Sequence, residues 1–553
     1  MDKSSSPASV NGGPKALALK PALILAVAGG LLQTLAWPRP SFWPLTFVCL
    51  IPLWRSIIGQ RRSRSFLIGW AYGLSLSLSS FYWVSDVMSV YGGLGPVGGL
   101  FILILMALLM GLYKALWAYL ALTAINLSSQ TTLKRLIGPA LGAFLWLAFD
   151  WWQNILLTGF NWTPLAGSLS GCLPLLGLSD ILGVYGLGFL VALISLLIAS
   201  VLFSKLDKKA AFLQIGIVLF LLASLWGYGR YRLAYYDGLS QEAEKVRVVL
   251  LQGSVPQDVK WDPNFRDEVL KRYSKLVTQA RDQKPWLIVW PETALPFIYG
   301  LDIVETQWLK DLLDQSQDNY ILGLASAQYD ISGSLRLYNR AQLTKGADFG
   351  AYYDKEHLVP FGEYIPLKQY LPILDWPFFQ NIIGAAGAYS PGRRKAPMEL
   401  DEQKFSLLIC YESIFPSLSR QKVLDGSQFL VITTNDAWFG GSAAPLQHLR
   451  HAVLRAVENR RPVARAANNG LSALILPSGR IVNQTKQDEI TIVSLDLPLI
   501  APNKLPLTFF VSFGHFLAPI AAAAALIYLM FTVITEWRIE RQKNRLAKKR
   551  NSK

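Results

Sequence analysis

The sequence predicts an α-helical membrane domain of about eight transmembrane helices together with an α/β domain folded as a sandwich. Of the 553 residues, 52% are hydrophobic and only 16% are charged, a balance typical of a chain that lies largely in a bilayer. Long apolar runs recur before residue 229 and once more near the C-terminus. Between them, short strand-like runs alternate with segments of helical spacing, which favours an α/β fold.

The first part of the chain is predicted to be a tail and seven transmembrane helices. Residues 1–14 are rich in Ser, Gly and Pro and are expected to be disordered. The membrane domain then covers residues 15–228. We interpret its first apolar run as a retained span, because cleavage after Ala28 would leave too short an apolar core for a signal peptide. The predicted spans are 21–37, 42–54, 66–84, 97–124, 136–152, 181–203 and 210–228.

The positive charge predicts the orientation of these spans. The net charge of +16 collects in short segments between apolar runs and in the C-terminal tail, whereas the loops 85–96 and 153–179 contain no Lys or Arg. Since basic loops stay in the cytoplasm, the N-terminus is predicted to be cytoplasmic and the chain after the seventh span extracytoplasmic. No basic groove with interleaved aromatic residues is visible in the α/β part, which argues against nucleic-acid binding.

The uncharged loops carry aromatic residues instead, at 81–83, 151–152 and 160–162. They form either the ordinary belt of aromatic side chains at a membrane surface or the lining of a lipid path beneath the α/β domain. Asp150 is an acid at the edge of an apolar span, which is costly without a partner and therefore indicates function.

Residues 229–505 are predicted to form the α/β domain, on the extracytoplasmic side. Segments around Leu270 and Leu446 have helical spacing. A final transmembrane helix at 506–536 and a basic cytoplasmic tail at 537–553 complete the chain. The predicted strands are 246–251, 287–290, 321–325, 337–343, 405–409, 429–433, 471–476 and 490–495.

Three reactive side chains follow strand-like runs in the α/β domain. Cys410 follows the apolar run 405–409, Glu292 follows 286–290, and Lys355 follows an aromatic strand. A lone cysteine is most often a small buried hydrophobe. Together, however, the three side chains suit thiol acyl transfer, in which Glu292 removes the thiol proton and Lys355 stabilises the thiolate and the oxyanion.

The motifs WPETALP, KEHLVPFGEYIP, CYES and NDAWFG resemble those of the nitrilase superfamily and, in these forms, of its membrane branch, the apolipoprotein N-acyltransferases. The resemblance covers the whole chain and implies a nitrilase-like αββα sandwich. It places Glu292, Lys355 and Cys410 at the catalytic positions. It also implies supporting roles for Glu363, Tyr411 and Glu412, and importance for activity, by substrate binding, for Trp261.

The resemblance implies an acyltransferase of the bacterial inner membrane whose catalytic domain faces the periplasm. Cys410 would take an acyl chain from a membrane glycerophospholipid as a thioester. The acceptor would be the free α-amine of the diacylglyceryl-cysteine at the start of an apolipoprotein. No metal, nucleotide or other cofactor is expected, and the pair His448 and His451 is only weak evidence for zinc.

Two other functions fit parts of the sequence. A membrane-anchored nitrilase-type amidase would pass the acyl group to water, although eight spans exceed what anchoring needs. A transporter with a degenerate binding domain would not need the set of Glu292, Lys355 and Cys410. The aperiodic segment 367–391 is either a packed surface loop or a lipid-dipping lid that binds substrate through Trp376, Phe378 and Phe379.

Overall fold

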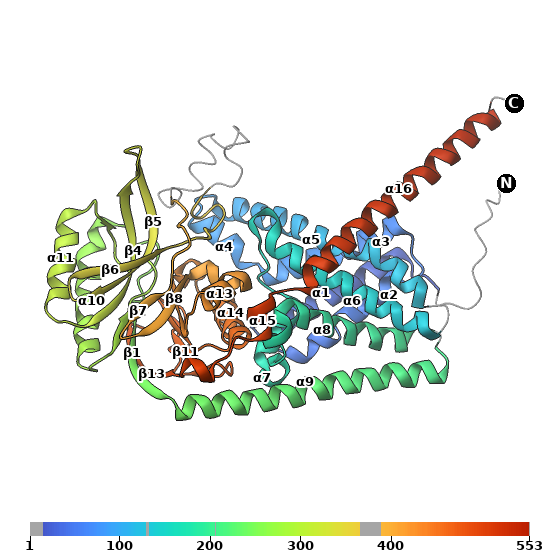
Figure 1. Ribbon diagram of the computed structural model, residues 1–553. Helices are drawn as coiled ribbons and strands as arrows, with labels where there is room; N and C mark the ends of the chain where they lie inside the picture. Colours follow the sequence, from blue (N-terminus) through green and yellow to red (C-terminus); the bar gives the residue numbers. More distant parts are fainter. Residues whose placement is uncertain (1–14, 129–131, 205, 365–388, 552–553) are drawn as a thin grey trace.

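The computed structural model describes residues 15–128, 132–204, 206–364 and 389–551. The tail of residues 1–14, and Trp376, Phe378 and Phe379 of the predicted lid, lie outside these ranges. A helical bundle forms one end of the molecule and an α/β part forms the other (Figure 1). The helices of the bundle are α1 (Leu19–Ala36), η1 (Trp43–Phe47), α2 (Leu50–Ile57), α3 (Arg62–Ser80), α4 (Trp83–Val90), α5 (Gly95–Ser128), α6 (Thr132–Ile155), η2 (Leu156–Thr158), η3 (Leu165–Gly171), α7 (Leu173–Leu176), α8 (Ser179–Phe203) and α9 (Lys208–Glu242).

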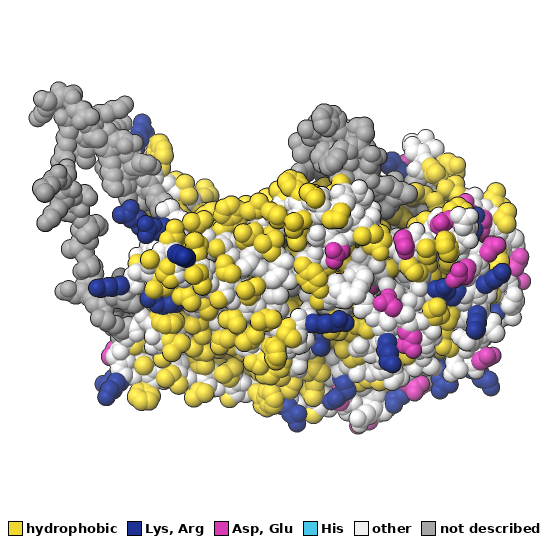
Figure 2. Space-filling model, turned by 180° about the vertical axis from the view of Figure 1, so that it is seen from behind, with side chains coloured by type: hydrophobic (Ala, Val, Ile, Leu, Met, Phe, Trp, Pro, Cys, Tyr) yellow, Lys and Arg dark blue, Asp and Glu magenta, His cyan; other side chains and the backbone are white. Residues whose placement is uncertain are grey.

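Within the described ranges, five helices are long and apolar enough to cross a membrane: α1, α8, α9 and the apolar parts of α5 and α16. The predicted spans at 66–84 and 136–152 form helices α3 and α6, and the one at 42–54 forms a shorter apolar segment, Trp43–Ile57. Hydrophobic side chains cover the bundle, whereas charged side chains of both signs gather over the α/β part (Figure 2). These features support a membrane protein, and the count of eight spans stays a prediction.

Helix α9 links the two parts of the chain. It runs along the bundle towards the sheets (Figure 1) and continues past Tyr228, the predicted end of the membrane domain, to Glu242. The first strand begins only at Glu244. The sequence did not indicate this extension, because polar residues after Tyr228 end the apolar run without ending the helix.

The α/β part contains two sheets. The first has the strand order β13-β1-β2-β4-β5-β6, with β3 attached to β4, and the second has the order β12-β11-β10-β9-β8-β7. In the first sheet β1, β2 and β4 run parallel, as do β8, β9 and β10 in the second. The strands are β1 (Glu244–Gln252), β2 (Leu287–Val289), β3 (Ile298–Tyr299), β4 (Asn319–Tyr329), β5 (Leu335–Lys345), β6 (Asp348–Asp354), β7 (Met398–Leu400), β8 (Gln403–Ile409), β9 (Phe429–Thr434), β10 (Val463–Ala467), β11 (Ala473–Ile475), β12 (Ile481–Val482) and β13 (Thr491–Leu499).

Side chains on these strands alternate between two layers. Val248 of β1 and Leu407 of β8 belong to the core between the sheets. Val249 belongs instead to the core that the first sheet shares with helices α10 (Arg266–Arg281) and α11 (Ile303–Asp314). The second sheet packs on its outer face against α13 (Pro416–Leu424) and α14 (Ala444–Asn459). The order of layers is αββα, which confirms the predicted sandwich.

The α/β part rests on the bundle through helix α14. Glu458 Oε1 accepts a hydrogen bond from the Val184 amide of α8 at 2.8 Å. Arg460, just after α14, donates to Gly177 O at 2.9 Å and to Asp180 Oδ2 at 2.9 Å. These bonds are buried, so α14 fixes the α/β part to the bundle.

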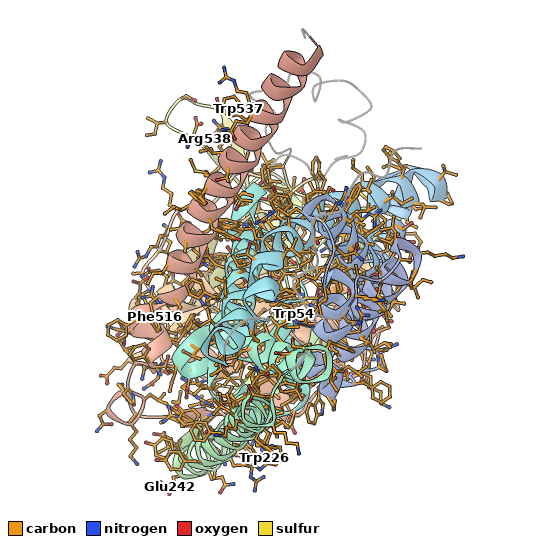
Figure 3. All side chains as sticks on the ribbon, turned by 90° about the vertical axis from the view of Figure 1, so that its right-hand side faces the viewer. Trp54, Trp226, Glu242, Phe516, Trp537 and Arg538 are labelled. Atoms are coloured by element: carbon orange, nitrogen blue, oxygen red, sulfur yellow. The ribbon has the colours of Figure 1, made fainter. Side chains whose placement is uncertain are left out.

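The C-terminal span is interrupted. Helix α15 (Phe509–Phe513) ends at Gly514, whose φ of 65° suits glycine, and α16 (Leu517–Asn551) begins after it. Helix α16 projects from the bundle (Figure 1), and Figure 3 shows Phe516 near its start and Trp537 and Arg538 far along it. The predicted span therefore starts at Leu517, later than residue 506.

Candidate active site

Cys410 lies at the turn where strand β8 ends and the short helix η7 (Cys410–Ile414) begins. Its φ is 50°, in the left-handed region that residues other than glycine rarely occupy. Such a backbone costs about 1–3 kcal/mol and persists only where its surroundings hold it in place. The thiol is therefore presented from a sharp, strained turn at the end of a buried strand.

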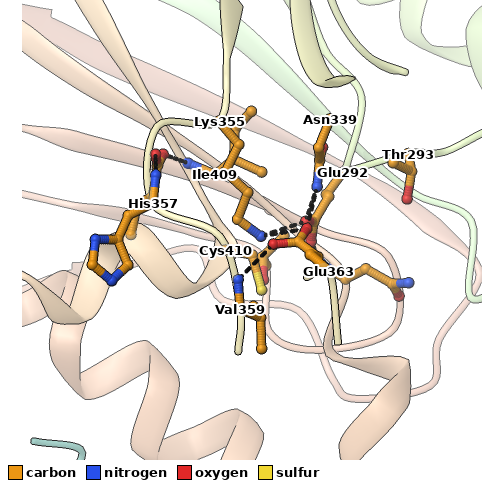
Figure 4. Close-up of polar contacts among 12 residues, drawn as sticks. Glu292, Thr293, Asn339, Lys355, His357, Val359, Glu363, Ile409 and Cys410 are labelled. Atoms are coloured by element: carbon orange, nitrogen blue, oxygen red, sulfur yellow. Dashed lines mark hydrogen bonds and ion pairs between the residues drawn. The ribbon is translucent and has the colours of Figure 1, made fainter. Parts of the chain in front are cut away.

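Glu292 and Lys355 follow strands β2 and β6 of the facing sheet. Because the two sheets pack face to face, both side chains reach the end of β8 from the opposite layer. Figure 4 shows Cys410 beside Lys355, Glu292 and Glu363. The structure thus brings together the three residues that the sequence predicts to be catalytic, and Glu363 with them.

The Lys355 ammonium bridges two carboxylates. Its Nζ lies 3.2 Å from Glu292 Oε1 and 2.9 Å from Glu363 Oε1. The Asn339 amide donates to the same two oxygens, at 2.7 Å and 2.9 Å. The remaining carboxylate oxygens accept from backbone amides, Glu292 Oε2 from Asn435 and Glu363 Oε2 from Val359, each at 2.8 Å. Each carboxylate is therefore held in one orientation (Figure 4).

The buried charges shift the pKa values of Lys355 and Cys410. Burial alone lowers the pKa of Lys355, but the carboxylates of Glu292 and Glu363 outweigh burial and raise it well above its usual value. Burial raises the pKa of the Cys410 thiol, Glu292 raises it further, and Lys355 only partly opposes them. The resting site therefore holds an ammonium and a protonated thiol, and the thiol needs a base to become a nucleophile.

Glu412 connects the loop of Lys355 to the turn of Cys410. Its Oε1 accepts from Tyr353 Oη at 2.8 Å and from the amides of Glu356 and His357 at 2.7 Å and 3.0 Å. Its Oε2 accepts from the Ile409 amide at 2.7 Å. Because this one buried side chain holds residues on both sides of the site, Glu412 fits the supporting role that the sequence predicts.

Tyr411 connects the same turn to the membrane part. Its hydroxyl donates to Gly159 O at 2.7 Å, and its ring stacks on Phe160 with centroids 6.4 Å apart. Phe81, Trp83 and Trp162 are buried in the same cluster as Tyr411. These three residues therefore pack against the turn that carries Cys410 and are not an exposed aromatic belt.

Asp150, which the sequence left without a partner, is paired. Its Oδ1 lies 3.0 Å from Lys114 Nζ, and its Oδ2 accepts from the Leu165 amide at 3.2 Å. Its backbone oxygen accepts from Asn161 Nδ2 at 2.7 Å. The ion pair therefore fixes the loop that packs against Tyr411 through Phe160 and Trp162.

Trp261 lies in a turn after β1, and 43% of its surface is exposed. The neighbouring Lys260 is buried and donates to Thr293 Oγ1 at 2.8 Å. Burial lowers the pKa of Lys260 to about 8, although Glu292 opposes the shift. Lys260 and Asn339 were not predicted from the sequence as part of the site. A signal existed for Asn339, a polar residue within a strand-like run, but Lys260 lies in a polar turn.

His448 and His451, the pair considered as a zinc site, form hydrogen bonds with other groups of the protein. His448 Nδ1 lies 2.8 Å from Asp436 Oδ1, and His451 Nε2 lies 2.8 Å from Trp162 O. Over the described ranges, no group of three or more His, Cys, Asp or Glu side chains is arranged to hold a metal ion.

Two family models match this chain. Residues 29–197 match the apolipoprotein N-acyltransferase N-terminal domain, and residues 247–504 match the carbon-nitrogen hydrolase domain. Among solved structures, Nit3 of Saccharomyces cerevisiae, from branch 10 of the nitrilase superfamily, is similar to 46% of this chain over 92% of its own, with 20% identity and a TM-score of 0.36.

Two curated relatives are similar over most of the chain. The apolipoprotein N-acyltransferase of Geobacter metallireducens is 33% identical over 84% of this chain and 86% of its own length. That of Pseudomonas aeruginosa is 32% identical over 84% of this chain and 88% of its own. With both matched domains in place and this identity along most of its length, the chain belongs to the apolipoprotein N-acyltransferase family, within the carbon-nitrogen hydrolase superfamily.

Proposed function

We propose that this chain acylates apolipoproteins at their N-terminus. It moves an acyl chain from a membrane glycerophospholipid, by way of a thioester on Cys410, to the α-amine of S-diacylglyceryl-cysteine. The observation that carries the proposal is the Lys355 ammonium held between Glu292 and Glu363 beside the Cys410 thiol. This arrangement supplies a nucleophile, a base and a cation at one point.

In the first half-reaction, Glu292 takes the proton of the Cys410 thiol while sulfur attacks the ester carbonyl carbon of the phospholipid. The carbonyl oxygen becomes an oxyanion, which the nearby Lys355 ammonium stabilises. When this intermediate collapses, the bond to the glycerol oxygen breaks and Glu292 returns its proton to that oxygen. The products are a lysophospholipid and a thioester.

In the second half-reaction, the α-amine of the lipoprotein attacks the thioester carbon and Glu292 takes a proton from the amine nitrogen. Lys355 again stabilises the oxyanion. Collapse breaks the carbon–sulfur bond, and the proton on Glu292 passes to sulfur, which restores the thiol. The acyl chain ends as an amide, and no redox step or external cofactor enters the balance.

The position of the site relative to the bundle supports a lipid donor. The turn that carries Cys410 packs, through Tyr411, against loops that connect the apolar helices. We place this face at the extracytoplasmic side of the bacterial inner membrane, because the loops 85–96 and 153–179 contain no Lys or Arg. A donor in that leaflet would reach the thiol without leaving the bilayer surface.

The test follows an acyl label to its destination. Purified full-length protein in vesicles of acyl-labelled phospholipid is incubated with and without a diacylated lipopeptide. With the lipopeptide, the proposal predicts lysophospholipid and a labelled amide on the peptide. Without the lipopeptide, it predicts the loss of only one donor molecule per enzyme molecule. Continuous release of labelled fatty acid, unchanged by the peptide, would instead identify a hydrolase that uses water as acceptor.

A further inference from the structure

His448 is a buried histidine that contacts the backbone of the proposed nucleophile. It lies on helix α14, and its side chain has no access to solvent. Its Nε2 lies 3.1 Å from the carbonyl oxygen of Cys410 and 2.8 Å from Ser413 Oγ. Its Nδ1 lies 2.8 Å from Asp436 Oδ1. The ring therefore joins the turn of Cys410 to an acidic side chain.

The partners determine which ring nitrogens carry protons. Burial would raise the pKa of Asp436, but Arg465 and His448 outweigh it and lower the pKa to about 2. An ionised carboxylate and a carbonyl oxygen both only accept hydrogen bonds. The Cys410 carbonyl is therefore bound by His448 only when Nε2 donates to it. On the other side of the ring, Arg465 Nη2 also lies near Nδ1, at 3.3 Å.

Asp436 is itself held in place on several sides. Arg465 donates to its Oδ2 at 2.6 Å, and Thr434 donates to its Oδ1 at 3.0 Å. A side chain at Gly470 would put its Cβ 2.1 Å from Asp436 Oδ2, so glycine is needed there. Arg465 and Asp436 are fully buried. The ring of His448 is thus anchored to a buried charged pair, formed by Asp436 just after β9 and Arg465 in the middle of β10.

We propose that His448 is a positioning residue for acyl transfer. By holding the Cys410 carbonyl, it maintains the left-handed backbone, φ 50°, that aims the thiol at Glu292 and Lys355. This inference rests on the proposed role of Cys410 as the nucleophile. A strained residue released from its partner relaxes towards commoner backbone angles, which would move the sulfur away from the base.

Two substitutions separate this role from simple space filling. In His448→Gln the amide nitrogen lies near the position of Nε2 and can still donate to the Cys410 carbonyl. In His448→Asn it lies near Nδ1 and can donate only to Asp436. With full-length protein in phospholipid vesicles, we expect His448→Asn to slow single-turnover formation of the acyl-enzyme by about 100-fold at an unchanged KM for phospholipid. His448→Gln should form the acyl-enzyme at least about tenfold faster than His448→Asn.

His451→Asn is the matched control, because His451 lies on the same helix, is equally buried and holds a different carbonyl, that of Trp162. It should acylate faster than His448→Asn at a comparable melting temperature. If His448→Asn does not fold, Asp436→Asn is measured instead, because it weakens the hydrogen bond that anchors the same ring. We expect it to slow formation of the acyl-enzyme by at least about tenfold.

Two results would overturn the inference: a wild-type acylation rate in His448→Asn, or equal losses in the Gln and Asn variants, since the ring would then act only by its volume. Cys410→Ser, measured in parallel, separates this from the proposed function. If Cys410→Ser still transfers acyl chains, the proposed function fails. If it is inactive while His448→Asn reacts normally, only the role of His448 fails.

Discussion

Lys355 sets the charge balance of the site. Its single ammonium lies within ion-pair distance of two buried carboxylates, those of Glu292 and Glu363. Asn339 supplies the second shared donor. In this arrangement Glu292 keeps an ordered, solvent-poor position from which it can accept a proton from sulfur. Loss of Lys355 would leave both buried carboxylates without this counter-charge, which costs several kcal/mol.

Glu292→Gln should block formation of the acyl-enzyme. The amide keeps the shape of the side chain, and its oxygen can still accept from Lys355 and Asn339. Its NH2 group then faces the Asn435 amide, and it cannot accept the thiol proton. We expect acylation to fall by at least about 100-fold. The measurement is the rate of lysophospholipid release in a single turnover. If Glu292→Gln releases it at the normal rate, Glu292 is not the base.

The raised pKa of Cys410 predicts how the alkylation of its thiol depends on pH. Because burial and the Glu292 carboxylate disfavour the thiolate, the free thiol stays protonated near neutral pH. Alkylation of Cys410 by iodoacetamide should therefore accelerate continuously from pH about 7 to about 9.5, without the plateau of a low-pKa cysteine. The label on the Cys410 peptide is counted by mass spectrometry. A rate already constant above neutral pH would show a stable thiolate and would remove the need for a base.

The sequence predicts the reactive residues better than their partners. Glu292 and Cys410 each follow an apolar run and Lys355 follows an aromatic strand, a local pattern that is visible without a structure. The roles of Asn339, Lys260 and Asp436 depend on which strands lie side by side, and that information is not local. Trp261 was predicted from family resemblance alone, and its exposed position leaves its role a proposal.

At the scale of elements, the connection between α6 and α7 joins the membrane part to the site. Asp150, near the end of α6, pairs with Lys114 of α5, which also lies over the Trp146 ring at 4.0 Å. Asn161 and Leu165 in the connection bond to Asp150. The same connection holds Tyr411 through Gly159. One buried ion pair therefore orders the α6–α7 connection, against which the turn that carries Cys410 packs.

Breaking this pair from one side should destabilise the protein more than removing both charges. Asp150→Asn leaves the Lys114 ammonium buried without its counter-charge, at a cost of about 3–5 kcal/mol. The double variant Lys114→Met with Asp150→Asn removes that unpaired charge and should regain part of the loss. Melting temperatures in detergent measure both. The single variant Lys114→Met completes the comparison. If the double variant lowers the stability by as much as the two single variants added together, the two residues act independently.

The elements themselves were predicted to different degrees. Apolar runs identified the helices of the bundle, and alternating runs identified most strands of the sandwich. Strand β10 was missed, because its sequence VARAA contains Arg465, a charged residue that is paired inside the protein with Asp436, which follows strand β9. The break in the C-terminal helix at Gly514 was also missed, because the apolar run of the sequence continues across it.

At the scale of the whole molecule, Asp180 joins three parts of the chain. It lies on α8 and accepts from Tyr228 and Arg232 of α9 and from Arg460 after α14. Arg460 also stacks over the Tyr236 ring at 4.7 Å. The sandwich is therefore fixed to the ends of two long apolar helices, and the orientation of these helices determines on which side of the membrane the site lies.

That orientation predicts the result of reporter fusions. Alkaline phosphatase fused after Glu242 should be active, because the end of α9 is predicted to be extracytoplasmic. Green fluorescent protein fused after Lys553 should fluoresce, because the basic C-terminal tail is predicted to be cytoplasmic. Both activities are measured in intact cells against the reciprocal fusions. The reverse pattern at either point would contradict the arrangement of eight spans.

The proposed thioester on Cys410 can be detected by mass spectrometry of the Cys410 peptide. After incubation of the full-length protein with phospholipid alone, we expect a mass increase of one acyl chain on Cys410 that hydroxylamine removes. Addition of a diacylated lipopeptide should discharge it as the peptide gains the same mass. Transfer to the lipopeptide by a Cys410→Ala variant, with no acylated intermediate at any time, would show that the reaction does not pass through a thioester on Cys410.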